Sequence, residues 1–452
     1  MAPSVSGVIK AVVALCVLVG CVGAAMHPPD GSHFAARAPI LLGIAWLAFA
    51  VAVWQLPRRR VVPLVLGGAV ALQLAAGFAP PRSSDDMYRY VWDGRVQAAG
   101  IDPYRYPPAA PELAGQRDPG FLWSPDGRWC TPEAGCTHIN RPTVPTIYPP
   151  VAEAYFTVVH WLSPPGGRTG PMQFAAALFA LATTMLLLFA RGCDPRAAAL
   201  WGWCPTIAVE AANNAHVDVL AAFLTALAVL LIARGRSWAG GAVLGLAIAT
   251  KVTPVLVAPA LARRRPVAVG VAALLAVILV YLPHVAVVGP KVLGYLPGYL
   301  REEGYAGGRR FALLTLIVPG AWAAPLAVLV LAGVALWVLR TADPDRPSAV
   351  WEAGVIMVGA ALLVSAPGYP WYATLLVVLV AASGRAEWLG VAAAGYLVAY
   401  AADIGLDPLL AQRLGYGAAL AAVVAVSAWR GRTSGTAAGF SGSTTHVRQR
   451  AS

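Results

Sequence analysis

Residues 245–266 read GLAIATKVTPVLVAPALARRRP, which is two short apolar segments that flank one lysine and end at an arginine cluster. Apolar windows that end in arginine clusters recur from residue 6 to residue 430. A membrane-spanning helix needs roughly 20 apolar residues, and cytoplasmic loops of membrane proteins are rich in arginine and lysine. The pattern therefore predicts an all-α polytopic integral membrane protein. Within it, the two segments beside Lys251 predict short broken helices that meet part-way through the membrane at a polar cavity.

Composition supports the same class and limits the partners. Of the 452 residues, 58% are hydrophobic and only 12% are charged, which is more apolar surface than a soluble globular chain buries. The formal net charge of +12 is concentrated in short clusters between apolar windows, as the positive-inside pattern requires. We therefore expect membrane lipids, and no nucleic acid, among the partners.

Placing the arginine-rich connections in the cytoplasm divides the chain into four regions. Residues 1–80 hold N-terminal transmembrane spans, and residues 81–168 form an extracytoplasmic loop with a candidate catalytic helix. Residues 169–430 form the transmembrane core, with a second outer loop near 289–311, and residues 431–452 form a disordered cytoplasmic tail. The path predicts about 13–14 transmembrane segments, including the two short broken helices.

The first outer loop contains two structural signals. The stretch YPPVAEAYFTVVHWLSPP (148–165) is amphipathic and is expected to lie at the membrane surface without crossing it. Cys130 and Cys136 predict a disulfide, because this loop lies outside the cytoplasm on the predicted path.

The stretch SSDDMYRYVWDGRVQAAG (83–100) follows the third predicted span and is rich in acids and aromatic residues. Three- and four-residue spacings predict an amphipathic helix over residues 85–99. Its polar face carries Asp86, Arg89, Tyr90 and Asp93. Ser83 and Asp86 have the spacing of a helix-capping box, yet two successive acids beside the membrane exceed what a cap requires. From the residues alone, capping and catalysis are equally supported for the pair Asp85 and Asp86.

Two further polar groups interrupt apolar windows. In NNAHVDVL (213–220), the asparagines are expected to satisfy the backbone of a turn. His216 and Asp218 lie two residues apart and therefore on different helix faces, which argues against a metal pair formed by this helix alone. Lys251 is one of only three lysines. It is either a cation that faces a buried phosphate or a side chain that extends to the membrane surface.

The second outer loop concentrates positive charge outside the membrane. It contains Arg301, Arg309 and Arg310. Arginine forks suit phosphate oxygens, so these residues are candidates for binding a phosphate. The alternatives are solvated side chains, contacts with lipid headgroups, and pairing with Glu302 and Glu303.

Four runs of sequence together resemble a known family. They are DDMYRYVWDGRVQAAGIDPYRYPP (85–108), IYPPVAEAYF (147–156), NNAHVDVL (213–220) and GLAIATKVTPVLVAPALARRRP (245–266). The chain resembles, over roughly residues 80–375, the polyprenyl-phosphate-dependent glycosyltransferases of the C-type membrane fold, in particular family 87 and related mannosyltransferases. Members of that group commonly carry the acidic motif soon after the first span, whereas two further predicted spans precede it here.

The resemblance implies a multi-pass enzyme of the cell membrane whose active site is extracytoplasmic. It implies transfer of a hexose, most often mannose, from a polyprenyl phosphate sugar donor to a lipid-linked glycan or another envelope acceptor. In that group an aspartate of the first large outer loop is the general base, a role that falls here on Asp86, with Asp85 as the alternative. A single base and direct displacement predict inversion at the anomeric carbon. No cofactor is obligatory, although a divalent cation that bridges the phosphate is allowed.

The remaining candidates fit this chemistry. A departing lipid phosphate gathers negative charge, which a nearby cation stabilises. The candidates for binding the donor phosphate are Lys251, His216, Arg309, Arg310 and Arg301. The candidates for binding the substrate are Arg89, Tyr90, Asp93, Asp218, Tyr104 and Trp371. For the aromatic residues the alternative is the belt of Tyr and Trp that membrane proteins place at the interface.

Two other classes of function use the same features. A transporter or flippase of lipid-linked sugars, without chemistry, would use the same cations and aromatic side chains. A scaffold subunit of an envelope complex would need no cavity. Acids at the outer mouth favour an enzyme, because transporters place their charged residues near mid-membrane.

Overall fold

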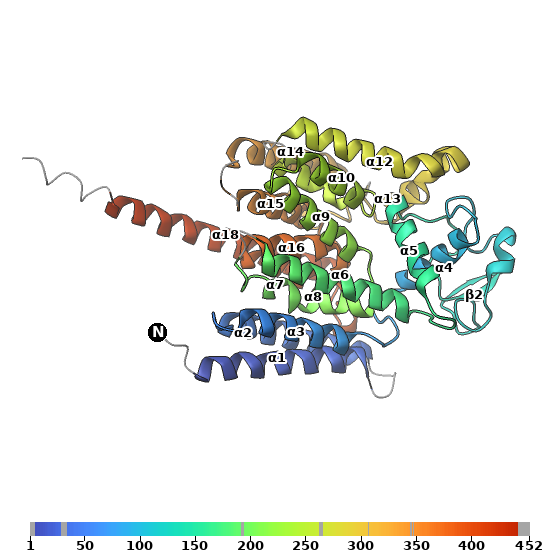
Figure 1. Ribbon diagram of the computed structural model, residues 1–452, viewed down its shortest axis with the longest axis horizontal. Coiled ribbons are helices and arrows are strands. Elements are labelled where there is room, and N and C mark those ends of the chain that lie inside the picture. The colour runs from blue at the N-terminus through green and yellow to red at the C-terminus, as the bar shows by residue number, and fades with distance from the viewer. Residues whose placement is uncertain are drawn as a thin grey trace, which may run out of the picture.

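The structure is a computed structural model that describes residues 5–28, 34–190, 194–261, 265–305, 307–343, 346 and 348–441. Long helices lie side by side in a bundle, and a smaller polar lobe covers one end of it (Figure 1). The lobe contains the only two strands of the described ranges. This arrangement agrees with the predicted all-α membrane fold.

Three helices form the N-terminal edge of the bundle. They are α1 (Val5–Met26), α2 (Phe34–Gln55) and α3 (Val61–Ala76). All three are apolar, as the windows in the sequence predict. The third helix ends beside the lobe, so the chain enters the first outer loop at that end of the bundle (Figure 1).

The lobe is built around two crossing helices and a small hairpin. Its elements are α4 (Asp86–Ala98), η1 (Pro111–Gln116), β1 (Trp129–Thr131), β2 (Gly135–Thr137) and α5 (Pro150–Leu162). Cys130 and Cys136, the predicted pair, form a disulfide across the hairpin. The backbones of α4 and α5 approach closely at Gly94, where a Cβ would lie 2.4 Å from the carbonyl oxygen of Phe156. Glycine is therefore required at this crossing.

The centre of the bundle is made of broken helices. The elements are α6 (Gly170–Phe189), α7 (Ala199–Gly202), α8 (Pro205–Ile207), η2 (Ala208–Asn213), α9 (Asp218–Ala233), α10 (Ser237–Ile248), η3 (Thr253–Val257), α11 (Ala258–Leu261) and α12 (Pro266–Val288). The segments 205–213 and 218–233 meet at 119°. The predicted break beside Lys251 is present between α10 and η3.

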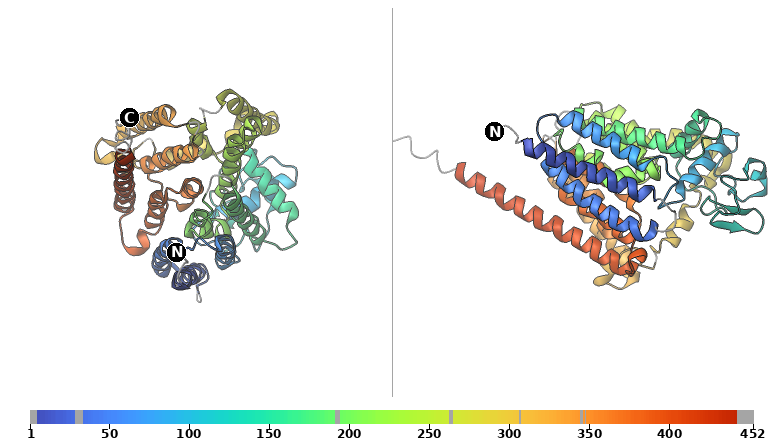
Figure 2. Two further views of the ribbon diagram at one scale, coloured as in Figure 1. Left: turned by 60° about the vertical axis from the view of Figure 1, so that its left-hand side comes forward. Right: turned by 90° about the horizontal axis from the view of Figure 1, so that it is seen from below.

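The C-terminal part completes the bundle. Its elements are η4 (Gly289–Leu293), α13 (Leu296–Glu302), η5 (Leu314–Leu316), α14 (Gly320–Thr341), α15 (Ala349–Ser365), η6 (Pro370–Ala373), α16 (Thr374–Ser383), η7 (Ala386–Trp388), α17 (Leu389–Ala399), η8 (Ala402–Ile404) and α18 (Pro408–Ser441). Helix α18 projects beyond its neighbours at the end opposite the lobe (Figure 2). It continues to Ser441, so residues 431–441 are helical where we expected a disordered tail; residues 442–452 lie outside the described ranges.

Lengths and composition support a polytopic membrane protein. Among the described residues, six helices are long and apolar enough to cross a membrane, and the bent pair 205–213 and 218–233 makes a seventh span if counted as one. Five more apolar helices contain 10–17 residues. The full-length spans are thus fewer than the 13–14 segments expected, because several predicted segments are short or broken helices.

Residues 289–311, the predicted second outer loop, fold back onto the lobe. The backbone N–H of Tyr295 donates to the carbonyl oxygen of Thr146 at 3.1 Å. The neighbouring Gly294 has φ +53°, and a Cβ there would lie 1.8 Å from the same oxygen. Only glycine fits this contact. The two outer loops therefore form one polar cap over the same end of the bundle.

Candidate active site

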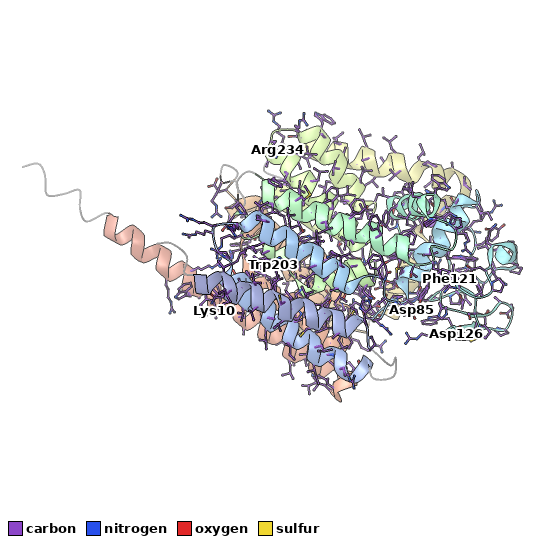
Figure 3. All side chains as sticks on the ribbon, turned by 60° about the horizontal axis from the view of Figure 1, so that its bottom comes forward. Lys10, Asp85, Phe121, Asp126, Trp203 and Arg234 are labelled. Atoms are coloured by element: carbon purple, nitrogen blue, oxygen red, sulfur yellow. A yellow bond between two sulfur atoms is a disulfide. The ribbon has the colours of Figure 1, made fainter. Side chains whose placement is uncertain are left out.

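The acid pair that begins α4 faces two different surroundings. Asp85 Oδ2 accepts hydrogen bonds from Arg128 Nη1 at 3.4 Å and from Trp129 Nε1 at 3.3 Å, both near the disulfide hairpin. Asp86 Oδ1 accepts a hydrogen bond of 2.5 Å from Asn140 Nδ2, and its Oδ2 lies 3.8 Å from Nδ1 of His216. Figure 3 shows Asp85 where the bundle meets the lobe. The side chain of Asp86 thus points toward the helix bundle, whereas the side chain of Asp85 contacts the lobe.

The predicted capping box is wrong. Asp85 is the N-cap residue of α4, but its side chain makes no capping hydrogen bond. The N–H of Asp86 instead donates to Ser84 Oγ at 3.1 Å. Ser83 is occupied elsewhere, because its Oγ accepts a hydrogen bond of 2.6 Å from Asn214 Nδ2. Neither acid is needed as a side-chain cap.

His216 is buried between two carboxylates. Its Nδ1 faces Asp86 and lies 3.4 Å from the hydroxyl of Tyr90, and its Nε2 lies 3.3 Å from Glu210 Oε2. The imidazole stacks on the indole of Trp371 with ring centroids 4.0 Å apart. Since its side chain is fully buried, His216 does not present a free face to a phosphate in this structure.

The polar run 213–220 fixes the entry of α4. Asn213 Oδ1 accepts from the N–H of Arg82 at 3.0 Å, while its Nδ2 donates to the carbonyl oxygen of Pro80 at 3.2 Å. Asn214 Nδ2 also donates to Glu210 Oε2 at 3.0 Å. The asparagines satisfy backbone groups, but these belong to the segment 76–83 that precedes α4, and not to their own turn as predicted. Glu210 belongs to the π-helical turn η2, which places its carboxylate beside Asn214. Such turns are often found at functional sites.

Lys251 lies in the break between α10 and η3. Its Nζ is 2.7 Å from Asp218 Oδ2 and 5.1 Å from the ring centroid of Tyr372. The side chain of Lys251 is 21% exposed, and that of Asp218 is 7% exposed. The ammonium group is therefore held inside the polar end of the bundle by a carboxylate and an aromatic ring, and does not extend to the surface as the alternative required.

The three arginines of the second outer loop have different surroundings. The guanidinium of Arg310 pairs with Glu303 at 2.7 Å, and both side chains are buried. The same guanidinium lies 5.8 Å from the ring centroid of Tyr369 and 5.5 Å from that of Tyr372. Arg301 and Arg309 are exposed. Of the three, only Arg310 is thus packed against the ring of Tyr372, which also borders Lys251.

Several predicted substrate contacts hold the lobe together. Arg89 and Asp93 form a buried ion pair at 2.9 Å, and Arg89 also donates to the carbonyl oxygen of Val144. The hydroxyl of Tyr104 donates to the carbonyl oxygen of Tyr148 at 2.6 Å. The structure therefore uses Arg89 and Asp93 to fix the loop against α4, and Tyr104 to join two parts of the loop, with all three side chains buried.

The other aromatic candidates are packed around His216. Tyr90 is 1% exposed and stacks on Phe156 at 4.4 Å between ring centroids. Trp371 is 8% exposed and lies between His216 and Tyr369, with centroids 4.0 Å and 4.7 Å away. Both faces of this indole are occupied in the structure. These rings build the wall of the site and are not an interfacial belt.

The surroundings of Asp86 tune its basicity. Burial raises the pKa of Asp86 above its ordinary value, whereas the charge of Lys251, the hydrogen bond from Asn140 and the charge of Arg141 lower it. Asp218 adds a smaller effect that raises the pKa. A largely enclosed carboxylate whose raised pKa is offset in part by nearby cations is suited to accept a proton.

Asn140 provides a direct test of this tuning. Removal of its donated hydrogen bond in Asn140→Ala destabilises the ionised form of Asp86 and raises the pKa of that carboxyl. Because a base must be ionised, we expect the acid limb of the pH profile of kcat/KM to move to higher pH. The measurement is the rate of sugar transfer from pH 4 to 9 in membranes that contain equal amounts of variant and wild-type protein. An unchanged acid limb would mean that the titrating base is not Asp86.

Sequence reasoning missed three residues of this site. Asn140 and Arg141 lie in an irregular loop with no motif, and Arg141 pairs with Glu302 at 2.6 Å across the two outer loops. Of the three, Glu210 could have been identified from the sequence, because an acid inside an apolar window requires a buried partner. The fold places Glu210 beside His216 and the hydroxyl of Tyr396, the latter 2.8 Å away.

The described ranges contain no group of three or more His, Cys, Asp or Glu side chains arranged to hold a metal ion. A divalent cation that bridges a donor phosphate, as the resemblance allows, therefore stays a prediction. Lys251 and Arg141 are cations of the chain whose charges act on Asp86. Arg310 packs on the ring of Tyr372, which also borders Lys251.

Comparison with known proteins gave one match. The model of glycosyltransferase family 87 matches residues 146–367. This range covers α5, the bent helix pair, Lys251 and the second outer loop, whereas Asp86 precedes it. No curated protein and no solved structure matches the chain.

Proposed function

We propose that this chain, which matches the model of glycosyltransferase family 87 over residues 146–367, transfers a hexose, most often mannose, from a polyprenyl phosphate donor. The acceptor is a lipid-linked glycan or another envelope glycan at the extracytoplasmic face of the cell membrane. The observation that carries this proposal is Asp86, a carboxylate 18% exposed, held by Asn140 within the electrostatic influence of Lys251. Base and cation occur together at the polar end of an otherwise apolar bundle.

The proposed reaction is a direct displacement. Asp86 accepts the proton of an acceptor hydroxyl while that oxygen attacks the anomeric carbon of the donor sugar. The bond between the anomeric carbon and the phosphate oxygen breaks, and its electron pair stays on the polyprenyl phosphate. One displacement inverts the anomeric carbon. A positioned general base contributes roughly 10²–10⁴ in rate.

Lys251 is the proposed cation for the donor phosphate. Its ammonium pairs with Asp218 in the structure. Because an ammonium has three donors, it can bind a phosphate oxygen at the same time. Negative charge on the departing phosphate is stabilised by a cation already in place. Arg310, packed on the neighbouring tyrosines, is the second cation, and Arg301 and Arg309 have no role in this proposal.

His216 takes a different role from the one expected from sequence. It lies between the Asp86 and Glu210 carboxylates with its ring fixed by Trp371. We assign it to packing against Asp86, because its Nδ1 lies 3.8 Å from Oδ2, beyond hydrogen-bond distance, and its Nε2 makes no hydrogen bond to Glu210. Direct binding of the donor phosphate by His216 is not part of the proposal.

The test is sugar transfer by the purified protein. The protein in lipid nanodiscs is incubated with a panel of polyprenyl phosphate sugars and lipid-linked glycan acceptors, and the products are separated and their anomeric configuration determined. We expect transfer from one donor with inversion. If no donor is consumed, while proteoliposomes move lipid-linked sugar across the bilayer, the protein is a transporter and the proposal fails.

A further inference from the structure

A cavity of about 440 Å³ lies apart from Asp86, between α4, α5 and the beginning of α6. Its volume is in the range of sites that hold small ligands. Phe156, Val159 and Met172 form apolar parts of its lining, and Arg95, His160 and Arg168 contribute polar groups. A lining that is apolar in one part and cationic in another suits an amphiphile with an anionic group.

The side chains that line this cavity carry a positive formal charge, because two arginines, Arg95 and the exposed Arg168, outnumber one acid. Asp118 is the acid of the lining, and both of its oxygens are engaged, one by Arg95 at 2.9 Å and the other by the N–H of Leu122 at 3.0 Å. No carboxylate lies within ion-pair distance of Arg168 among the described residues; its guanidinium lies 5.6 Å from the ring centroid of Phe121. Burial and the charge of Arg95 lower the pKa of His160, so a bound anion would relieve this repulsion.

The same helices present apolar side chains to their surroundings. On α5, beside His160, Trp161 is 67% and Leu162 is 79% exposed, and on α6 Phe174 is 57% exposed. Exposed apolar side chains next to a spanning helix mark a surface that contacts lipid. Acyl chains can therefore lie along α5 and α6 while a headgroup enters the cavity.

The cavity and the Asp86 site lie on opposite sides of one aromatic layer. Phe156 lines the cavity and stacks on Tyr90, whose hydroxyl lies 3.4 Å from His216. A ligand in the cavity thus contacts the back of the wall that positions His216. It is separated from Asp86 by packed side chains.

We propose that this cavity binds the phosphate-bearing headgroup of an anionic phospholipid, with Arg168 and Arg95 as the phosphate ligands. The acyl chains run along the exposed apolar surface of α5 and α6. The site is separate from the sugar-transfer site, and the inference does not depend on the proposed reaction.

The experiment measures retained lipid. Wild-type protein is exchanged into nanodiscs of phosphatidylcholine with 20% phosphatidylglycerol, extracted gently, and analysed by native mass spectrometry for bound phosphatidylglycerol. We expect Arg168→Gln to lower the retained phosphatidylglycerol about tenfold, the effect of losing one charge-assisted contact. Arg168→Lys should retain an intermediate amount. Arg234→Gln is the matched control, because Arg234 is exposed at the far end of the bundle from Phe121 (Figure 3).

A parallel arm separates lipid from free phosphate. In detergent, phosphatidylglycerol should raise the melting temperature of the wild type but not of Arg168→Gln, whereas inorganic phosphate at the same concentration should have no effect. The proposal is overturned if Arg168→Gln retains as much phosphatidylglycerol as Arg234→Gln. The proposal is also overturned if inorganic phosphate raises the melting temperature of the wild type and no phosphatidylglycerol is retained. The ligand of the cavity would then be a soluble anion.

Discussion

Asp86→Asn should abolish sugar transfer while leaving the protein folded in the membrane. The amide keeps the volume of the carboxyl group but cannot accept the proton of the acceptor hydroxyl, so we expect kcat to fall about 10²- to 10⁴-fold. Binding of the donor should change little, because Lys251 and Arg310 are untouched. The measurement is the initial rate at saturating donor and acceptor, with the amount of folded protein determined by fluorescence-detected size exclusion.

Asp85→Asn is the matched control, one residue away in the same helix turn. Asp85 contacts Arg128 and Trp129 in the lobe and does not face His216, so this variant should keep activity within a few fold of wild type. An inactive Asp85→Asn beside an active Asp86→Asn would move the base by one position. If both variants are active, displacement assisted by Asp85 or Asp86 is not the mechanism.

The fold could be predicted from sequence because the bilayer restricts it strongly. Backbone groups in hydrocarbon must be satisfied within a helix, so each apolar window predicted a helix, and the break beside Lys251 was visible as two short segments. The lengths of full spans were harder to predict. Windows such as 349–365 and 374–383 are apolar but short. A helix buried among other helices is as apolar in sequence as a helix that faces lipid.

The site was predicted in part, because the sequence shows residue types and not their partners. The pattern predicted a helix near 85–99 with Asp86 on its polar face, and α4 spans Asp86–Ala98. It could not separate Asp86 from Asp85, since that depends on Asn140 and Arg128, which come from distant loop positions.

The same limit explains the misplaced substrate contacts. Arg89 and Asp93 lie four residues apart on one helix face, and the sequence cannot say whether that face meets solvent or another chain segment. The loop around Val144 covers it, which turns two candidate ligands into a buried ion pair. Glu210 shows the reverse case, since its burial was readable from sequence but its partner His216 was brought close only by the π-helical turn.

Lys251→Met should selectively weaken use of the donor. If the ammonium contacts the donor phosphate, its removal costs one charge-assisted interaction, and we expect kcat/KM for the donor to fall about 10- to 100-fold, with the KM for the acceptor unchanged. The variant also leaves Asp218 buried without its cation, which should lower the free energy of unfolding by about 1–3 kcal/mol. The measurements are donor kinetics and the melting temperature in the same detergent.

The double variant Lys251→Met/Asp218→Asn separates these two effects. Because it removes the unpaired carboxylate, it should recover most of the lost stability, whereas donor use should stay as poor as in the single variant. Lys291→Met is the control for general loss of a lysine, since Lys291 is an exposed side chain of the second outer loop and should have wild-type donor kinetics. If the double variant recovers donor kinetics together with stability, Lys251 serves only to neutralise Asp218, and the donor phosphate is bound elsewhere, with Arg310 as the next cation to replace.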